Sequence, residues 1–308
     1  MRVFLTGSSG YIGQRVLRLL SEDPEVDEIV GFDLAPPTVD FPKLRYVQGD
    51  VTQPFDDLLE GVDAAVHLAF IVDPMQDEAL QERINLGGTS NFISAVRKHR
   101  VKDVVVFTSA TAYGAHADNP EFMKEGDPLR GNSDYPYARD KVRQEALVNA
   151  LRVDGMRVKV LRPVVVFGPN VSNFISRYLT RFAVVAAVGW SPRFQLVHED
   201  DVARAVTTLV RHPGEGAYNL AADGVMDTVE AAKRVGRPLV RLPLFLLRIL
   251  IWLGWKLRLK ALTEAPPGML SYLIYPWLVD NRRLKEEAGF SYLHSTEETF
   301  QAFLDARS

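Results

Sequence analysis

Three glycines near the N-terminus lie between an apolar run and an amphipathic segment, and this arrangement limits the fold more than any other feature of the chain. The apolar run covers Arg2 to Thr6, and the glycines are Gly7, Gly10 and Gly13. Apolar side chains then recur at helical spacing, and a second apolar run, Glu28 to Phe32, follows. This order predicts a strand, a tight turn, a helix and a second strand, which together form a βαβ unit.

Short runs rich in β-branched residues recur after this unit. They cover residues 45–47, 64–69, 104–108 and 158–161, and amphipathic or polar chain separates each run from the next. Such alternation is typical of parallel strands, because parallel strands need long crossover connections and are covered on both faces. We therefore predict an α/β fold, a Rossmann-type doubly wound parallel sheet.

The glycine turn also has the chemistry of a phosphate site. Residues without a Cβ allow a tight turn and a close approach of phosphate, and the helix N-terminus supplies free N–H groups and a partial positive charge. Asp33 ends the second run, twenty residues after Gly13, where a carboxylate can accept hydrogen bonds from an adenosine ribose diol. Leu34, Ala35 and Pro36 follow, with no basic residue to bind a 2′-phosphate. The pattern favours NAD over NADP. The alternative is a structural turn with a solvated aspartate.

The alternating pattern fades after Phe167, where Gly168, Pro169 and Asn170 interrupt the chain. A length of 308 residues is typical of two domains. We predict an NAD-binding Rossmann domain at residues 1–168, with later returns to the sheet near 194–222. Residues 169–308 are expected to form mostly a smaller C-terminal substrate-binding lobe.

Tyr137 and Lys141 form the second group with recognisable chemistry. They are four residues apart at the start of a predicted helix, so they share one face. A phenol titrates at about pH 10, and an adjacent ammonium stabilises the phenolate, which makes such a pair a usable general acid/base. Ser109 and Thr111 follow a strand on the same side of the predicted sheet and offer hydroxyls to a substrate oxygen. The plain alternative is a surface contact between a tyrosine and a lysine.

Together these segments resemble the extended short-chain dehydrogenase/reductase superfamily, in its NAD-dependent epimerase/dehydratase branch. The resemblance extends over nearly the whole chain, to about Phe303, and the matching pieces come in the family's order. They are the glycine motif at 6–13, the ribose acid Asp33, Gly49-Asp50-Val51, His67-Leu68-Ala69, Asn85-Leu86-Gly87-Gly88-Thr89, Leu161-Arg162-Pro163, Phe167-Gly168-Pro169, the segment 197–202 and Tyr218-Asn219-Leu220.

The resemblance implies roles for individual residues. Tyr137 would be the general acid/base, Lys141 would hold the nicotinamide ribose and lower the pKa of the tyrosine, and Ser109 would hydrogen-bond the reacting oxygen. Substrate contacts would come from Ser109, Thr111 and Tyr137. The implied NAD contacts are Gly7, Gly10, Tyr11, Ile12, Gly13, Asp33, Leu34, Asp50, Val51, Leu68, Ala69, Phe70, Asn85, Thr108, Tyr137, Lys141, Pro163 and Val166.

The reaction implied is oxidation of a secondary alcohol by hydride transfer to NAD through a keto intermediate, with a (nucleotide-)sugar epimerase as the best match. Ala110-Thr111 stand where sugar-nucleotide dehydratases of the family carry an Asp-Glu pair, so elimination of water is not expected. The segment Trp190 to Gln195 lacks the family's usual Arg-Asp-Phe. The alternatives are a net NAD-dependent dehydrogenase or reductase of an apolar alcohol such as a hydroxysteroid, and a catalytically silent dinucleotide sensor.

Composition narrows the partners. A net charge of −3, from 36 basic and 39 acidic side chains, disfavours a nucleic-acid partner. The chain has no cysteine and its six histidines form no His-x-x-x-His pair, so we expect no metal site. Absence of cysteine fits a cytoplasmic protein, and the strand pattern that starts at Arg2 leaves no room for a cleaved signal peptide. The family resemblance implies a homodimer that pairs helices near 85–96 and 137–151.

An apolar stretch from Leu242 to Leu262 is the one segment that could reach a membrane. It is too short and too interrupted by charges to span a bilayer, which takes about 20 apolar residues. We predict a buried helix of the C-terminal lobe. A peripheral membrane anchor and a lid over an apolar substrate pocket stay open as alternatives. His198, which precedes a predicted helix, is expected to cap it.

Overall fold

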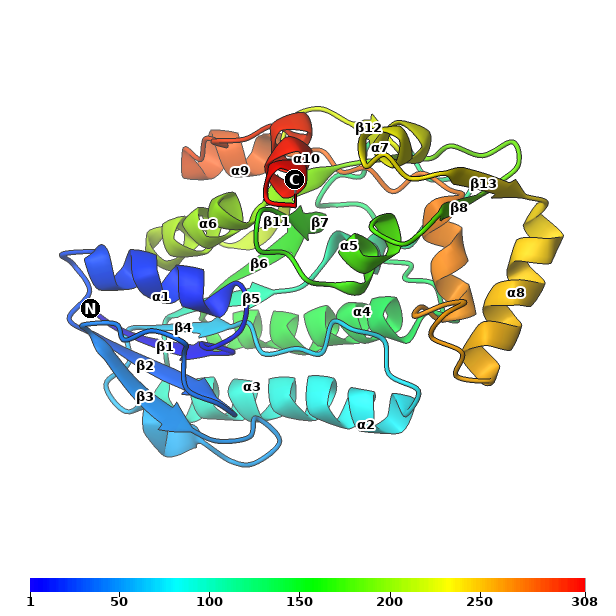
Figure 1. Ribbon diagram of the computed structural model, residues 1–308. Helices are drawn as coiled ribbons and strands as arrows, with labels where there is room; N and C mark the ends of the chain where they lie inside the picture. Colours follow the sequence, from blue (N-terminus) through cyan, green and yellow to red (C-terminus); the bar gives the residue numbers. More distant parts are fainter. Residues whose placement is uncertain (308) are drawn as a thin grey trace.

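The computed structural model describes residues 1–307 and is built on a seven-stranded sheet (Figure 1). The strands are β1 (Arg2–Thr6), β2 (Glu28–Asp33), β3 (Leu44–Gln48), β4 (Ala64–His67), β5 (Asp103–Phe107), β6 (Arg157–Pro163) and β11 (Gly216–Leu220). Their order across the sheet is β11-β6-β5-β4-β1-β2-β3, and all neighbours are parallel. This confirms the predicted doubly wound α/β fold, whose strand order reverses between β1 and β4.

Helices cover both faces of the sheet because alternate strand residues point to opposite sides. Val3 and Leu5 of β1 pack with α1 (Gly13–Glu22) and α6 (Glu199–Arg211), whereas Phe4 packs on the side of α3 (Gly88–His99) and α4 (Pro136–Asn149). Figure 1 shows these two helical layers above and below the sheet. Short helices complete this half: η1 (Asp56–Leu59), α2 (Glu78–Glu82), η2 (Arg83–Gly87), η3 (Ala110–Tyr113) and η4 (Ala150–Asp154).

Smaller elements fill the remainder of the chain. Three two-stranded sheets pair β7 (Val165–Phe167) with β10 (Leu196–His198), β9 (Arg193–Phe194) with β12 (Met226–Asp227), and β8 (Val184–Ala187) with β13 (Leu239–Leu242). The helices are α5 (Phe174–Leu179), α7 (Thr228–Arg234), α8 (Leu244–Lys256), η5 (Pro267–Leu273), α9 (Arg282–Ala288) and α10 (Thr296–Asp305). Within residues 194–222, β11 belongs to the large sheet and β10 to a two-stranded sheet. The division of the chain at residue 168 stays a prediction.

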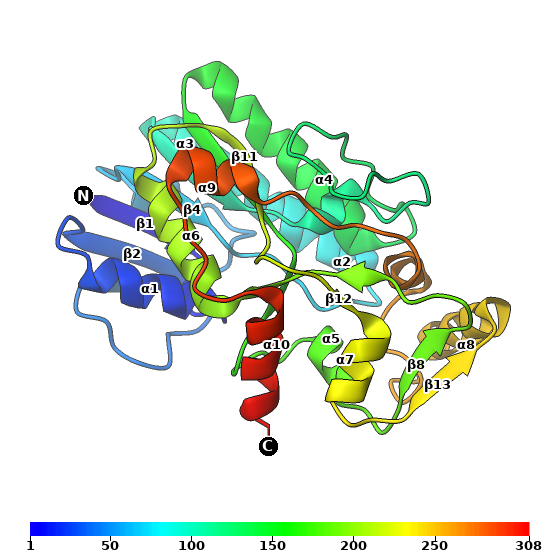
Figure 2. The same cartoon turned by 90° about the horizontal axis from the view of Figure 1, so that it is seen from above.

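The prediction of a buried helix at 242–262 is wrong. In α8 only Leu247 and Gly254 are buried, while Phe245 is 68% exposed and Trp252 is 49% exposed. Both views place α8 at an outer edge of the molecule (Figures 1 and 2). No helix within residues 1–307 is long and apolar enough to cross a membrane.

The predicted cap at His198 is confirmed. Its Nδ1 accepts a hydrogen bond of 3.2 Å from the Asp200 N–H at the start of α6. The ring also stacks on His294, with centroids 3.9 Å apart. His198 therefore joins the start of α6 to the segment before α10, which is a structural role.

Candidate active site

A cavity of about 680 Å³ opens at the carboxyl ends of the central strands. This is where a doubly wound sheet binds ligands, beside the point where its strand order reverses. All but two of the site residues expected from the sequence line it. These are Gly7, Gly10, Tyr11, Ile12, Gly13, Asp33, Leu34, Asp50, Val51, Leu68, Ala69, Phe70, Ser109, Thr111, Tyr137, Lys141, Pro163 and Val166.

The glycine loop has the shape of a dinucleotide cradle. Gly7 has a φ of +72°, and a Cβ there would lie 2.7 Å from the backbone nitrogen of Ala69. A Cβ on Gly13 would overlap the carbonyl oxygen of Gly7, so helix α1 can begin this close to β1 only with glycine. The Tyr11 hydroxyl is buried beside the loop and has no hydrogen-bond partner among residues 1–307.

Asp33 and its surroundings suit a free ribose diol. One carboxylate oxygen accepts from Ser9 N–H at 2.9 Å and the other from Leu34 N–H at 2.7 Å. Each oxygen has two lone pairs, so acceptor capacity remains for ribose hydroxyls. Leu34 is exposed at the rim, and Lys141 is the only cation among the described residues that line the cavity. The lining thus offers an acid for the diol and no cation beside it for a 2′-phosphate.

Tyr137 and Ser109 lie together in the cavity. Ser109 caps η3 by accepting from Thr111 N–H at 3.1 Å, and it accepts from the Thr111 hydroxyl at 2.9 Å. Burial raises the pKa of Tyr137 to about 12, and a hydrogen bond with Ser109 opposes that rise. The expected lowering of the Tyr137 pKa by Lys141 stays a prediction for the NAD-bound enzyme. A phenol with such a pKa is ionised in roughly one molecule in 100,000 at pH 7.

Lys141 shares a helix face with Tyr137 but is bonded elsewhere. Its ammonium donates to the carbonyl oxygen of Phe107 and to Gln144 Oε1, each at 3.0 Å. The same nitrogen lies 3.3 Å from the centroid of the Phe70 ring. Burial lowers the pKa of Lys141 well below its ordinary value, and the carboxylates of Asp140 and Glu145 oppose this shift. Sequence spacing could place Lys141 on the right face, but not foresee these contacts.

A buried chain of polar side chains fixes Lys141 from behind. Gln144, which accepts from Lys141, donates to the Thr89 hydroxyl at 3.4 Å. The two ring nitrogens of His67 continue the chain. Nε2 lies 3.2 Å from the Thr89 hydroxyl, and Nδ1 lies 2.7 Å from the Thr6 hydroxyl. Burial, aided by the charge of Lys141, lowers the pKa of His67 to about 3, so this ring is neutral at physiological pH. The chain ties α4 to the ends of β1 and β4.

Asn85 and Thr108 are the two expected NAD contacts that lie behind the lining. Asn85 belongs to η2, a turn of π-helix, and its Oδ1 accepts from the backbone N–H of Ile71 at 2.8 Å. The Thr108 hydroxyl is fully buried and donates to the carbonyl oxygen of Leu161 at 3.3 Å. In this geometry Asn85 positions a loop that lines the cavity, and Thr108 joins β5 to β6.

The far wall of the cavity was not foreseen from the sequence. It is formed by apolar and aromatic side chains of Phe174, Ile175, Met269, Tyr272 and Trp277. Tyr272 donates from its hydroxyl to the backbone oxygen of Thr111 at 2.8 Å, which connects η5 to the wall that contains Ser109 and Thr111. The only sequence signal for this wall was the three-residue spacing of Met269 and Tyr272, which suggests one face of a helical turn. The spacing does not tell whether that face points into the cavity.

Comparison with known proteins identifies a family and similar folds. The NAD dependent epimerase/dehydratase family matches residues 3–221. An uncharacterized protein of Mycobacterium tuberculosis is 26% identical over 318 residues, which cover 99% of this chain and 84% of that protein. An N-acetyl-alpha-D-glucosaminyl-diphospho-ditrans,octacis-undecaprenol 4-epimerase of Escherichia coli O157:H7 is 27% identical over 182 residues, 57% of this chain and 53% of that enzyme. The structure of MoeE5 in complex with UDP-glucuronic acid and NAD superposes with a TM-score of 0.79 at 23% identity, covering 100% of this chain and 99% of that one.

The sheet, the glycine loop and the Ser, Tyr and Lys side chains in one cavity define an extended short-chain dehydrogenase/reductase. The chain belongs to the NAD-dependent epimerase/dehydratase family.

Proposed function

We propose that this chain is an NAD-dependent sugar epimerase that oxidises a secondary alcohol to a ketone and then reduces the ketone from the opposite face. One observation carries the proposal: Ser109, Tyr137 and Lys141 line the same cavity as the glycine loop and Asp33. The names of similar proteins support a sugar substrate, since one is a 4-epimerase of a diphospho-linked sugar and another binds UDP-glucuronic acid.

Some residues of the cavity would hold NAD and others would transfer the proton. Gly7, Gly10 and Gly13 would hold the pyrophosphate of NAD, and Asp33 its adenosine ribose. When bound, NAD supplies the hydride acceptor. The phenolate form of Tyr137 would take the proton of the substrate hydroxyl and become the phenol, which returns the proton to the ketone oxygen, while the Ser109 hydroxyl orients that oxygen. The apolar far wall would exclude water from the reacting carbon.

A second candidate, a net dehydrogenase of an apolar alcohol such as a hydroxysteroid, is favoured by one specific observation. The far wall is apolar, and no cation other than Lys141 is among the described residues that line the cavity. The diphosphate of a nucleotide-sugar substrate would therefore have to pair with cations that lie outside this lining.

The two candidates differ in what happens to the cofactor. We expect protein purified without added cofactor to carry NAD(H), and turnover of a UDP-sugar to give no net change in absorbance at about 340 nm, because an epimerase regenerates NAD in each cycle. Product formation is measured by chromatography with UDP-glucose and UDP-glucuronic acid as probes. Steady NADH accumulation with a hydroxysteroid, from protein that purifies without cofactor, would contradict epimerisation and favour the dehydrogenase.

Cofactor choice gives a separate prediction. We expect tighter binding of NAD than of NADP, because Asp33 would repel a 2′-phosphate and no Arg or Lys among the described lining residues lies beside Asp33 to neutralise one. Asp33→Ala should weaken NAD binding and narrow the difference between the two cofactors. Calorimetry with the cofactor-free protein measures both affinities. The prediction fails if the wild-type protein binds NADP more tightly.

We also propose a homodimer. The family resemblance pairs helices near 85–96 and 137–151, but the apolar sides of α3 and α4 pack into the chain's own core rather than outward, as Phe92 and Val148 show. An outward groove between η2 and α4 remains, and it is lined partly by Leu86, Ala146 and Leu147. Light scattering at micromolar concentration should give twice the chain mass of 34.5 kDa. Leu147→Glu should release the monomer while Leu293→Glu, another exposed leucine, should not; a wild-type monomer would refute the dimer.

A further inference from the structure

The segment from Ala231 to Thr263 has a charge pattern unlike the rest of the chain. It contains eight Lys or Arg residues and no Asp or Glu. The whole chain has a net charge of −3, so the remaining residues carry −11. A strongly basic segment in an acidic protein is typical of contact with an anionic partner.

Apolar side chains of the same segment are exposed in a stripe along α8. Phe245, Ile249 and Trp252 recur at helical spacing of four and three residues, and all three are exposed. The opposite side of α8 packs on η5 through Leu247, which lies in a cluster with Leu270. The helix is therefore held by the protein on one side and presents an apolar surface on the other.

The chain turns back after α8 and extends this surface. Arg258 has a φ of +57°, and Leu259 N–H donates to the carbonyl oxygen of Gly254 at 2.8 Å. Gly254 permits the return, because a Cβ there would lie 2.9 Å from the Cβ of Leu262. Leu257, Leu259 and Leu262 are exposed as a result. We call the exposed side chains of residues 245–262 the apolar cationic surface.

The cations of this surface have no acidic partner in the part of the chain that the structure describes. Arg248, Lys256, Arg258 and Lys260 form no ion pair with any residue between 1 and 307. Lys256 instead lies 4.7 Å from the centroid of the Trp252 ring. A short apolar helix with Trp and unpaired cations beside it is the combination found in helices that lie in a membrane interface.

We propose that the apolar cationic surface binds an anionic lipid bilayer, with the stripe of α8 among the acyl chains and the cations at the lipid phosphates. A second copy of the chain fits less well, because a twofold contact through this surface would bring the same cations together. The proposal goes beyond the proposed function and does not depend on it.

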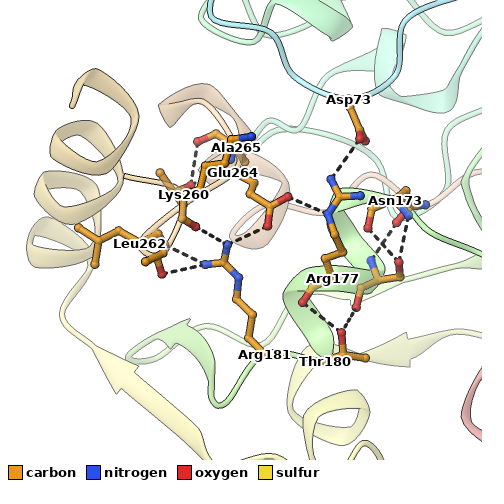
Figure 3. A network of polar contacts seen from close by, with 12 residues as sticks. Asp73, Asn173, Arg177, Thr180, Arg181, Lys260, Leu262, Glu264 and Ala265 are labelled. Atoms are coloured by element: carbon orange, nitrogen blue, oxygen red, sulfur yellow. Dashed lines mark hydrogen bonds and ion pairs between the residues drawn. The ribbon is translucent and has the colours of Figure 1, made fainter. Parts of the chain in front are cut away.

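A polar network connects this surface to the rim of the cavity (Figure 3). Arg181 donates to the backbone oxygens of Lys260 and Leu262 and pairs with Glu264 at 3.0 Å. Glu264 also pairs with Arg177 at 2.8 Å, and Arg177 pairs with Asp73 at 3.1 Å.

Asp73 lines the cavity, and Arg177 belongs to α5, whose first residues form its far wall. On the other side, Gln76 donates to the backbone oxygen of Trp255 at 3.0 Å. Binding at the apolar cationic surface would thus place the cavity rim next to the bilayer.

Vesicle sedimentation with the full chain tests the proposal. We expect binding to vesicles of phosphatidylcholine and phosphatidylglycerol mixed at about two to one, and little binding to phosphatidylcholine alone. Combining Lys256→Gln, Arg258→Gln and Lys260→Gln should weaken binding about 100-fold, since each cation near an anionic surface contributes about fivefold. Combining Phe245→Ser with Trp252→Ser should weaken it about tenfold or more. All these side chains are exposed, so thermal melting should be unchanged.

Matched controls use side chains of the same kinds elsewhere on the surface. Arg18→Gln, Arg45→Gln and Lys102→Gln combined remove three exposed cations, and Leu293→Ser removes an exposed leucine between α9 and α10; neither should change vesicle binding. No binding by the wild-type protein would overturn the proposal. Equal losses of vesicle binding in the control variants would also overturn it. So would a protein that does not bind vesicles but self-associates, if combining Phe245→Ser with Trp252→Ser abolished that self-association.

Discussion

Replacing Tyr137 with phenylalanine is expected to lower kcat by about 100-fold or more and to leave NAD affinity nearly unchanged. The variant keeps the ring, which packs edge-on against Phe70 with centroids 5.8 Å apart, and removes only the hydroxyl that shares a hydrogen bond with Ser109. An acid/base group acts on the chemical step, so its loss appears in kcat rather than in cofactor binding. Single-turnover rates and calorimetry separate these two effects.

The pH profile of the wild-type enzyme checks the same assignment. Burial raises the pKa of Tyr137 to about 12, so the phenol is protonated below that pH and the fraction of phenolate rises with pH. Alcohol oxidation, which needs the phenolate, should therefore accelerate toward alkaline pH, and Tyr137→Phe should lose this dependence. Tyr275→Phe removes a hydroxyl outside the cavity lining, from a ring packed on Trp190, and serves as the control. If Tyr137→Phe kept more than about a tenth of the wild-type activity, another group would have to carry out the proton transfer.

The sheet and the glycine loop were predictable because their signals are local. A short apolar run with glycines directly after it indicates a strand and a tight turn, and β1 has the predicted bounds of Arg2 to Thr6. Asp33 follows from the same unit, since the next parallel strand ends at the same edge of the sheet. The cofactor half of the cavity therefore depends on short-range pattern.

The substrate half depends on contacts between distant segments, which a single sequence does not determine. Met269 and Trp277 line the same cavity as Tyr137, although 132 and 140 residues of chain separate them from it. The bonds of Lys141 to Phe107 and Gln144 depend on how α4 settles on β5. For α8, apolar composition is the same whether a helix is buried or lies exposed, so only the packing of its neighbours decides.

Replacing Arg162 with methionine is expected to reduce the free energy of unfolding by about 3–5 kcal/mol, because it leaves the buried carboxylate of Glu145 without its partner. Arg162 is on β6 and Glu145 is on α4, one turn after Lys141, and both side chains are almost fully buried. The guanidinium pairs with both carboxylate oxygens and donates to the Tyr113 hydroxyl at 2.6 Å. Tyr113 in turn donates to Asn219 of β11 at 2.8 Å. Arg162 of the Leu161-Arg162-Pro163 segment thus fastens α4, which contains Tyr137 and Lys141, to the sheet.

Two further variants decide whether burial is the cause. Arg157→Met, at the other end of β6, removes a half-exposed guanidinium that pairs with Asp103. This variant should lower the free energy of unfolding by about 1 kcal/mol or less. Combining Arg162→Met with Glu145→Met removes both buried charges and should recover much of the loss, because no unpaired charge remains. Urea denaturation followed by circular dichroism measures all three. Equal destabilisation by Arg162→Met and Arg157→Met, or no recovery of stability in the double variant, would show that the buried pair does not hold α4 on the sheet. The position of Tyr137 and Lys141 would then depend on the apolar packing of α4 and on the polar chain from Gln144 to Thr6.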